Sequence, residues 1–263
     1  MNRLAFIATA MILCSASGAY AACGEVRYAY PNQHRPPYWL GEGQAVPDPP
    51  GAGVEFAREF AASGNCSLVL VRLPVLRLRT ELSSGAVDFA PVDITADGQA
   101  GIVIPRDAQG KPDAKRATPI VVVLFVRARD GINRETDPLD FVRDRQVGMT
   151  HGATYGTILQ RAGARLDLGS TSASANFEKL RRGRVDAFAL SLMTPGDMDK
   201  YVETHFHGDI VRLEKPVSRV LVWVGSSQAY YDAHRAQVES MWDWLGSDGT
   251  RRYYSILKKY TEQ

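Results

Sequence analysis

The chain has 263 residues and a formal net charge of +2, and 45% of its residues are hydrophobic. This length allows one large domain or two lobes of about 100 residues each. The near-neutral charge argues against nucleic acid or an anionic membrane surface as the main partner.

The N-terminus has the order of features of an export signal. Arg3 precedes an apolar run over residues 4–13 that is too short to span a bilayer, and Ala19-Tyr20-Ala21 fits a cleavage site. We expect residues 1–21 to be a signal peptide, the mature protein to be periplasmic, and no membrane span to follow. A lipid anchor on Cys23 is the alternative, although Tyr20 stands where a lipobox normally has Leu.

Cys23 and Cys66 are the cysteines that remain after such a cleavage. Each precedes a predicted strand, at residues 26–30 and 68–71. If these strands are neighbours in a parallel sheet, their starts lie close enough for a disulfide, which an exported protein can form. The bond would close a loop of roughly 40 residues and contribute about 3–4 kcal/mol. Two free thiols are the alternative.

The loop over residues 31–39 follows the first predicted strand. Loops at the carboxyl ends of parallel strands point toward a crevice where ligands bind. Tyr30, Tyr38 and Trp39 would there stack on a ligand. The alternative is that Tyr38 and Trp39 only close the edge of the lobe.

The next elements are a helix over residues 54–63, ended by Gly64, and a helix that begins at Pro74. Arg77, in the first turn of the second helix, is placed either to meet an anionic ligand or to face solvent. A polar loop at residues 91–99 follows the next strand and brings Asp93 and Thr95 toward the crevice.

Residues 120–126 are continuously apolar and rich in β-branched side chains, which predicts a fully buried strand that crosses between two lobes. A strand over residues 146–149 then leads into a turn with Gly152, Ala153, Thr154 and Tyr155. A helix over residues 157–162 follows. Backbone N–H groups at such a turn attract anions.

The last part of the chain predicts a helix capped by the hydroxyls of residues 170–174, and a strand followed by Ser191. Residues 219–224 predict the strand that returns to the first lobe. Residues 230–260 have helical spacing, and their aromatic side chains are expected to pack in the core.

The motif Leu-x-x-Gly-x-Val-Asp occurs twice, at residues 82–88 and 180–186. Each copy predicts the end of a helix, a glycine in the left-handed conformation, and a short strand. Two such units at matching places predict two similar α/β lobes with a cleft between them, where a small ligand would bind. Asp88 and Asp186 are expected to satisfy backbone groups at the strand starts rather than to form a catalytic pair.

Several common catalytic motifs are missing from the sequence. It contains no G-x-S-x-G elbow, no phosphate-binding loop, no G-x-G-x-x-G and no C-x-x-C. His205-Phe206-His207 is the only histidine pair. On a strand both imidazoles would share a face, but no third metal ligand is evident. We therefore expect no metal and no cofactor.

The order of features resembles the bacterial extracellular solute-binding proteins of family 3, the periplasmic receptors of ABC importers for polar amino acids and related solutes. The resemblance rests on the two Leu-x-x-Gly-x-Val-Asp copies and on the segments Pro36-Pro37-Tyr38, Gly53-Val-Glu-Phe-Ala, Asp93-Ile-Thr95 and Val147-Gly-Met-Thr-His-Gly152. It implies a mixed α/β fold of the type II periplasmic-binding-protein kind.

In such a fold two lobes are joined by two crossover strands, and hinge closure traps the ligand. Lobe one would be discontinuous and comprise residues 22–122 plus 219–263, and lobe two would comprise the inserted residues 123–218. The family also implies a monomer.

Two departures from the family bear on the ligand. Amino-acid binders of the family usually carry an Arg shortly after the Asp93-Ile-Thr95 position and an acid just after the second repeat strand. Residues 96–100 contain no Arg, and residues 189–192 contain no acid. Because a buried charged ligand needs a counter-charge, an ordinary α-amino acid is not expected. Arg77 is the candidate replacement for the missing cation.

The sequence thus predicts a periplasmic protein that binds a small polar solute and passes it to an ABC permease. The expected ligand contacts are Tyr30, Tyr38, Trp39, Arg77, Asp93, Thr95, Gly152, Ala153, Thr154, Tyr155 and Ser191. Two alternatives keep the fold. One is an accessory protein of a periplasmic oxidoreductase system, which binds a protein partner. The other is an enzyme that resembles cyclohexadienyl dehydratases, with His34, His151 and Asp93 as candidate acid–base groups.

Overall fold

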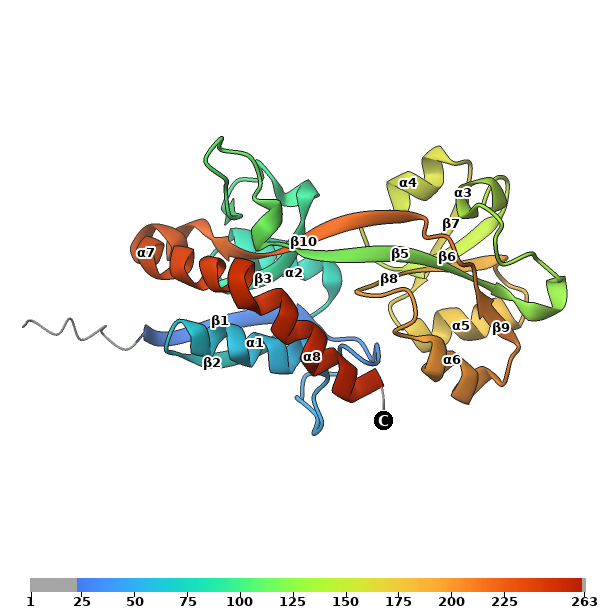
Figure 1. Cartoon of the computed structure of the whole chain (residues 1–263), viewed down its shortest axis with the longest axis horizontal. Coiled ribbons are helices and arrows are strands. Elements are labelled where there is room, and N and C mark those ends of the chain that lie inside the picture. Colours follow the sequence, from blue (N-terminus) through green and yellow to red (C-terminus); the bar gives the residue numbers. More distant parts are fainter. Residues whose placement is uncertain (1–22, 262–263) are drawn as a thin grey trace, which may run out of the picture.

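The computed structural model describes residues 23–261, so the predicted signal peptide lies outside the described residues. Figure 1 shows two bodies joined by two long strands, β5 (Thr118–Arg127) and β10 (Ser218–Ser227). We call the body that holds both β1 and α8 the first lobe and the other body the second lobe. No helix among the described residues is long and apolar enough to cross a membrane.

The first lobe is built from both ends of the described chain. Its elements are β1 (Cys23–Pro31), α1 (Ala52–Ser63), β2 (Cys66–Leu73), α2 (Val75–Ser83), β3 (Phe89–Asp93), β4 (Ile102–Val103), α7 (Gln228–Trp244) and α8 (Thr250–Thr261), with short 3-10 helices at Ile94–Ala96 and Ala114–Arg116 and a π-helical turn at Leu245–Gly249. β1 runs parallel to β2, the arrangement on which the expected disulfide depends, and also parallel to β3. Alternate residues of the strands face opposite layers, because Tyr28 packs with α1, α7 and α8 while Ala29 packs with α2.

The second lobe is formed by the middle of the chain. Its elements are α3 (Pro138–Phe141), β6 (Gln146–Thr150), α4 (Gly156–Arg161), β7 (Arg165–Ser170), α5 (Ala173–Arg181), β8 (Ala187–Leu192), α6 (Asp199–Phe206) and β9 (Ile210–Arg212), with a 3-10 helix at Ala128–Asp130. β6 lies between β7 and β8 and is parallel to both. The apolar run of β5 is buried on both faces, since Val121, Val123 and Phe125 join one core cluster and the residues between them join another.

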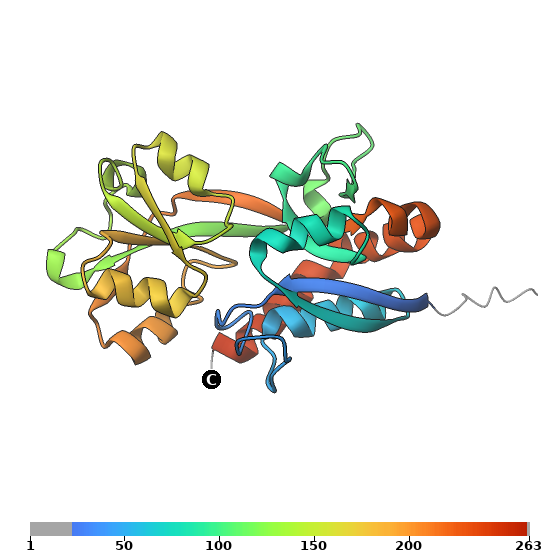
Figure 2. The ribbon, with the colours of Figure 1, turned by 180° about the vertical axis from the view of Figure 1, so that it is seen from behind.

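The two crossover strands link the lobes into one order of strands, β2-β1-β3-β10-β5-β8-β6-β7. Residues 118–122 of β5 pair antiparallel with residues 218–222 of β10. Beyond this segment β5 continues into the second lobe beside β8, while β10 continues into the first lobe beside β3. Figure 2 shows the same two strands from behind. This is the mixed α/β arrangement of type II periplasmic binding proteins, which the sequence predicts.

The two repeats occupy equivalent places in the two lobes. Gly85 and Gly183 have positive φ angles of 76° and 71°, as the motif predicts. The carboxylate of Asp88 accepts the backbone N–H of Arg27 at 2.7 Å, and that of Asp186 accepts the N–H of Gln146 at 2.9 Å. The predicted role of both aspartates is therefore confirmed. Directly after these aspartates the chain enters β3 and β8, which begin at Phe89 and Ala187.

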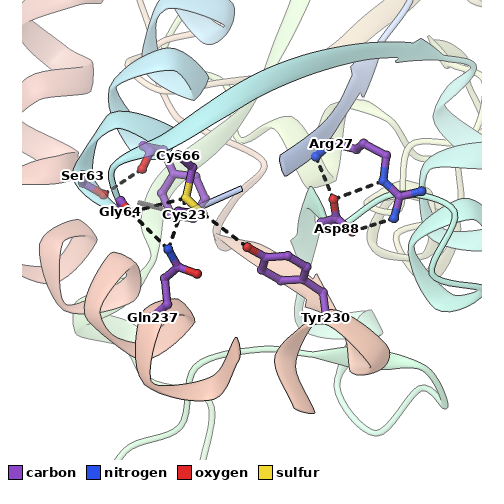
Figure 3. The surroundings of a disulfide bond; sticks show 9 residues. Cys23, Arg27, Ser63, Gly64, Cys66, Asp88, Tyr230 and Gln237 are labelled. Atoms are coloured by element: carbon purple, nitrogen blue, oxygen red, sulfur yellow. Dashed lines mark hydrogen bonds and ion pairs between the residues drawn. A yellow bond between two sulfur atoms is a disulfide. The ribbon is translucent and has the colours of Figure 1, made fainter. Parts of the chain in front are cut away.

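The disulfide between Cys23 and Cys66 is present in the structure. The two residues face each other across the parallel strands β1 and β2, with their Cα atoms 4.5 Å apart. Figure 3 shows the bond beside Tyr230 and Gln237 of α7, with the amide of Gln237 donating to the carbonyl of Gly64. The disulfide thus fixes the start of β1 to the start of β2.

One helix end and several short elements are not predicted by the sequence pattern. His205 and His207 do not lie on a strand, because α6 continues to Phe206 and His207 ends it with a positive φ of 48°. Buried Val202 and Phe206 have helical spacing, and this spacing favours a helix over a strand in this segment. The short elements α3, β7 and β9 have too few apolar residues to be recognised, and β4 is only two residues long.

Candidate ligand-binding site

A cavity of about 490 Å³ lies between the two lobes. Its volume falls in the range of about 300–1,000 Å³ that is usual for small-molecule sites. The first lobe contributes the loop after β1, the start of α2, the end of β3, and both crossover strands. The second lobe contributes the turn after β6 and the end of β8. Most of the lining side chains are aliphatic or aromatic.

The structure brings most of the predicted site residues to this cavity. Those that line it are Tyr38, Trp39, Asp93, Thr95, Gly152, Ala153, Thr154, Tyr155 and Ser191. They reach it because the loops concerned leave the carboxyl ends of β1, β3, β6 and β8, as the crevice rule for parallel strands predicts.

Tyr30 and Arg77 do not line the cavity. Tyr30 is buried behind Trp39, with the ring centroids 5.4 Å apart, and the guanidinium of Arg72 lies 5.6 Å from the tyrosine ring. Arg77 lies on the outer side of α2, where its 61% exposed side chain pairs with Glu81 one turn later. The structure therefore does not bring either residue to this cavity. The cation that α2 does place in the cavity is Arg79.

Arg79 belongs to a polar network around Asp93. The guanidinium of Arg79 donates to Oδ1 of Asp93 at 2.5 Å, and the backbone N–H of Thr95 donates to the same oxygen at 3.0 Å. The hydroxyl of Thr95 also donates to Oδ1 at 2.6 Å, and the hydroxyl of Thr154 donates to Oδ2 from the second lobe.

The network sets the charge state of Asp93. Burial alone would raise the pKa of its carboxyl group, but the hydrogen bonds from Thr154 and Thr95 and the charge of Arg79 outweigh burial and lower the pKa. Asp93 is therefore ionised at neutral pH and has donors on both of its oxygens.

Arg35 is the second cation of the cavity, in the loop after β1. One of its terminal nitrogens lies 3.4 Å from Oγ of Ser191 in the second lobe, and its guanidinium carbon lies 5.1 Å from the centre of the Tyr38 ring. Burial raises the pKa of Tyr155, and the charge of Arg35 acts in the opposite direction. Arg35 thus brings a positive charge to the place where the lobes meet.

Tyr38 connects the lobes directly. Its hydroxyl donates to Oδ2 of Asp197 and accepts the backbone N–H of Met193 at 2.7 Å. Asp197 also accepts from the backbone N–H of Thr194 at 2.8 Å and from the hydroxyl of the same residue. Burial raises the pKa of Tyr38, and the negative charge of Asp197 raises it further, so the phenol stays protonated.

The sequence gives only partial signals for the residues it misses. Arg35 lies in a loop that is predicted to face the crevice, but the aromatic side chains beside it carry the argument there. Arg79 lies two residues after Arg77, so the helix phase decides which of the two faces the cleft. Asp197 follows a Thr-Pro-Gly turn with no recognisable motif.

The candidate acid–base groups, His34, His151 and Asp93, do not meet at the cavity. Nδ1 of His34 accepts the backbone N–H of Gly41 at 3.0 Å, and Nδ1 of His151 lies 3.1 Å from the carbonyl of Leu168 on the surface. Neither histidine joins Asp93 among the residues that line the cavity. Across residues 23–261, no group of three or more His, Cys, Asp and Glu side chains is placed to hold a metal ion.

Comparison with solved structures identifies the class of fold. The chain is similar to a mutant of ArgBP from T. maritima, at 16% identity and a TM-score of 0.67, over 91% of this chain and 96% of that one. A substrate-binding protein of an amino acid ABC transporter from Streptococcus pneumoniae, bound to L-arginine, matches at 16% identity and a TM-score of 0.64, over 91% and 97% of the two chains. The GluR0 ligand-binding core from Nostoc punctiforme, in complex with L-glutamate, matches at 13% identity and a TM-score of 0.64, over 89% and 98%.

No family model matches the sequence, and no curated protein matches it either. At these identities the structural matches show the fold alone. The chain therefore has the two-lobed fold of the amino-acid-binding proteins of ABC transporters, over nearly the full length of those proteins. The resemblance that the sequence motifs indicate is confirmed at the level of the fold.

Proposed function

We propose that this protein is an exported solute receptor that captures one small organic molecule in the cavity between its lobes. The observation that carries the proposal is that both lobes line one cavity and contact each other across it, through Tyr38 with Asp197 and Asp93 with Thr154. A molecule bound there would touch both lobes and would favour the closed arrangement over an open one.

The lobe limits belong to the same proposal. Lobe one comprises residues 22–122 plus 219–263, and lobe two comprises residues 123–218. In support, residues 118–122 of β5 pair with residues 218–222 of β10. Near the end of this segment, at Val121, β5 begins to pair with β8 of the second lobe. This paired segment is the hinge, because it is the part of both strands that lies between the lobes.

The predicted signal peptide and the disulfide support a periplasmic location. We propose that the protein works there as a monomer, without a cofactor, and delivers its solute to an ABC permease. The solved structures of the same fold that carry the name of an amino acid ABC transporter support this role. Neither an oxidoreductase partner nor a dehydratase reaction has a specific observation in its favour.

Thermal unfolding of the mature protein against a panel of solutes tests the proposal. The panel holds amino acids, organic acids, amines and sugars at millimolar concentration. A solute that binds only the folded state raises the melting temperature by mass action. At 100 times its Kd, it adds about 2.7 kcal/mol to the free energy of unfolding. We expect at least one chemical class to raise the melting temperature.

Two tryptophan variants control the assay. Ser191→Trp fills the cavity and should abolish the shift, whereas Ala233→Trp, on the exposed face of α7, should retain it. A folded protein whose melting temperature no class of solute changes would contradict the proposal and favour a partner-binding accessory protein. That alternative would then be tested by isolating the complex from periplasm.

A further inference from the structure

The charged groups of the cavity are few, and they define what the ligand can be. Among the lining residues within the described range 23–261, only Arg35, Arg79 and Asp93 carry a formal charge. Arg79 and Asp93 neutralise each other in the ion pair described above. Asp93 has four hydrogen bonds on its two oxygens, from Arg79, from Thr95 twice and from Thr154. Three of these bonds fall on Oδ1 and one on Oδ2, so the carboxylate already serves the contacts between α2, the Thr95 turn and the second lobe.

The other acid near the cavity is also occupied. Asp197 has one oxygen engaged by Tyr38 and the backbone of Thr194, and the other engaged by the hydroxyl of Thr194. Asp197 is only 9% exposed, and it lies behind Tyr38 rather than among the residues that line the cavity. A ligand ammonium group would therefore find in the lining only one carboxylate, that of Asp93, whose charge is already paired with Arg79. An ammonium buried without a carboxylate of its own is strongly unfavourable.

Arg35, in contrast to these carboxylates, has few polar partners. No ion pair among residues 23–261 includes it, and its Nε–H is buried without a hydrogen-bond partner. Within the described part of the chain, its one side-chain hydrogen bond is the long contact with Ser191. A guanidinium presents a planar fork that matches a carboxylate, and an anionic ligand would supply the missing counter-charge.

The cavity that Arg35 lines is largely apolar. Tyr38, Trp39, Tyr253, Ile120, Leu192 and Met193 line the same cavity and give it room for a ring or a branched alkyl group. Aromatic walls favour a flat or bulky apolar body through stacking and burial.

We propose that the ligand is an organic acid with one carboxylate and an apolar body, without an ammonium group, and that Arg35 holds its carboxylate. This inference rests on the proposed function, since it names the class of solute that the same cavity takes. It also explains how the cavity supplies a cation although no Arg follows Asp93-Ile94-Thr95 in the sequence.

Matched compounds test the inference by isothermal titration calorimetry with the mature wild-type protein. The acids are 3-phenylpropionate, indole-3-propionate and 4-methylpentanoate. Each is compared with the amino acid that adds an ammonium group, which is phenylalanine, tryptophan or leucine. Each is also compared with the amine that keeps the ammonium and lacks the carboxylate, which is phenethylamine, tryptamine or 3-methylbutylamine.

We expect at least one acid to bind. Its amino acid should bind at least about tenfold more weakly, and its amine should not bind, because neither ammonium has a partner. Arg35→Gln should weaken binding of the acid by about 10–100-fold. Arg35→Lys should retain part of the affinity, because it keeps the charge and loses the planar fork. Arg77→Gln, on the exposed side of α2, should bind like the wild type. Circular dichroism confirms that each variant is folded.

The inference is overturned if an amino acid or an amine binds more tightly than its acid, an outcome that would leave solute capture standing. It is also overturned if folded Arg35→Gln binds the acid like the wild type. Binding of none of the nine compounds overturns it too. The wider solute panel then decides separately whether the cavity takes a solute at all.

Discussion

At the scale of single residues, Asp93 joins three parts of the molecule. Its carboxylate holds Arg79 of α2, the turn that begins at Thr95, and Thr154 of the second lobe. Its side chain is 16% exposed, so these bonds are only weakly screened by solvent. A charge held by several donors in such a place stabilises the arrangement of its partners.

Asp93→Asn should reduce stability in a pH-dependent way. The folded pKa of Asp93 is lowered from its ordinary value of 3.8. A carboxyl group with a lowered pKa contributes stability that is fully present above its unfolded pKa and is lost as the pH falls through the folded pKa. At pH 7 we expect a loss of about 1–3 kcal/mol in the free energy of unfolding. Urea unfolding of both proteins between pH 7 and pH 3 should show this difference shrinking below about pH 4.

Asp97→Asn provides a matched control for the loss of one charge. Asp97 is exposed and pairs with Arg106 at the surface of the first lobe, apart from the Thr154 contact. This change should alter stability by less than about 0.5 kcal/mol at pH 7. A difference between wild type and Asp93→Asn that stays constant over the pH range would show that the charge of Asp93 contributes nothing.

At the scale of elements, the start of α1 and the loop before it fit together through two glycines. A Cβ atom on Gly51 would lie 2.4 Å from the carbonyl oxygen of Tyr38, and one on Gly53 would lie 2.2 Å from the ring of Trp39. Gly51 also has a positive φ of 100°. The motif Gly53-Val-Glu-Phe-Ala therefore has a physical cause, which is the close approach of the cavity-lining loop to the helix.

Gly53→Ala separates this packing role from helix propensity. Alanine in a helix is favoured over glycine by about 1 kcal/mol, so propensity alone predicts a more stable protein. Displacement of the Trp39 ring predicts the opposite sign, a loss of about 1–3 kcal/mol. We expect the loss, measured by urea unfolding, together with weaker binding of any solute that the panel identifies.

Gly24→Ala is the control for this variant, because a Cβ atom on Gly24 in β1 meets nothing within 4 Å. Its stability should stay within about 0.5 kcal/mol of the wild type. If Gly53→Ala is instead as stable as the wild type, the Trp39 ring moves at no cost and does not depend on Gly53.

Much of the fold could be predicted from the sequence because its strongest elements have local causes. The apolar run of β5 and the two glycine-bearing repeats each specify an element without reference to the rest of the chain. The strands β7 and β9 are only six and three residues long and partly exposed, so their pairing depends on neighbours that are distant in sequence.

The candidate site could be predicted only in part for a similar reason. The positions follow from the carboxyl ends of the strands, and the structure brings Tyr38, Asp93 and Ser191 to the cavity as that rule predicts. Which arginine faces the cavity depends on helix phase and on the partner it finds. Arg77 finds Glu81 one turn away, whereas Arg79 finds Asp93 on another element.

At the scale of the whole molecule, the lobes are linked by two strands and by contacts across the cavity. Tyr38 reaches Asp197, and Arg35 reaches Ser191, each from the first lobe to the second. Figure 1 shows that β5 and β10 are the elements that run between the bodies. Opening the cavity would require these side-chain contacts to break while the strands bend, and a ligand that touches both lobes would oppose this opening.

Native mass spectrometry of the mature protein tests this account most directly. The protein is incubated with a deproteinised extract of cells and growth medium, and the mass of the intact complex is measured. We predict one added small molecule per chain, released as an organic acid on denaturation and absent from Ser191→Trp. A wild-type chain that keeps only its own mass in every fraction of the extract would contradict the claim that the cavity captures a solute.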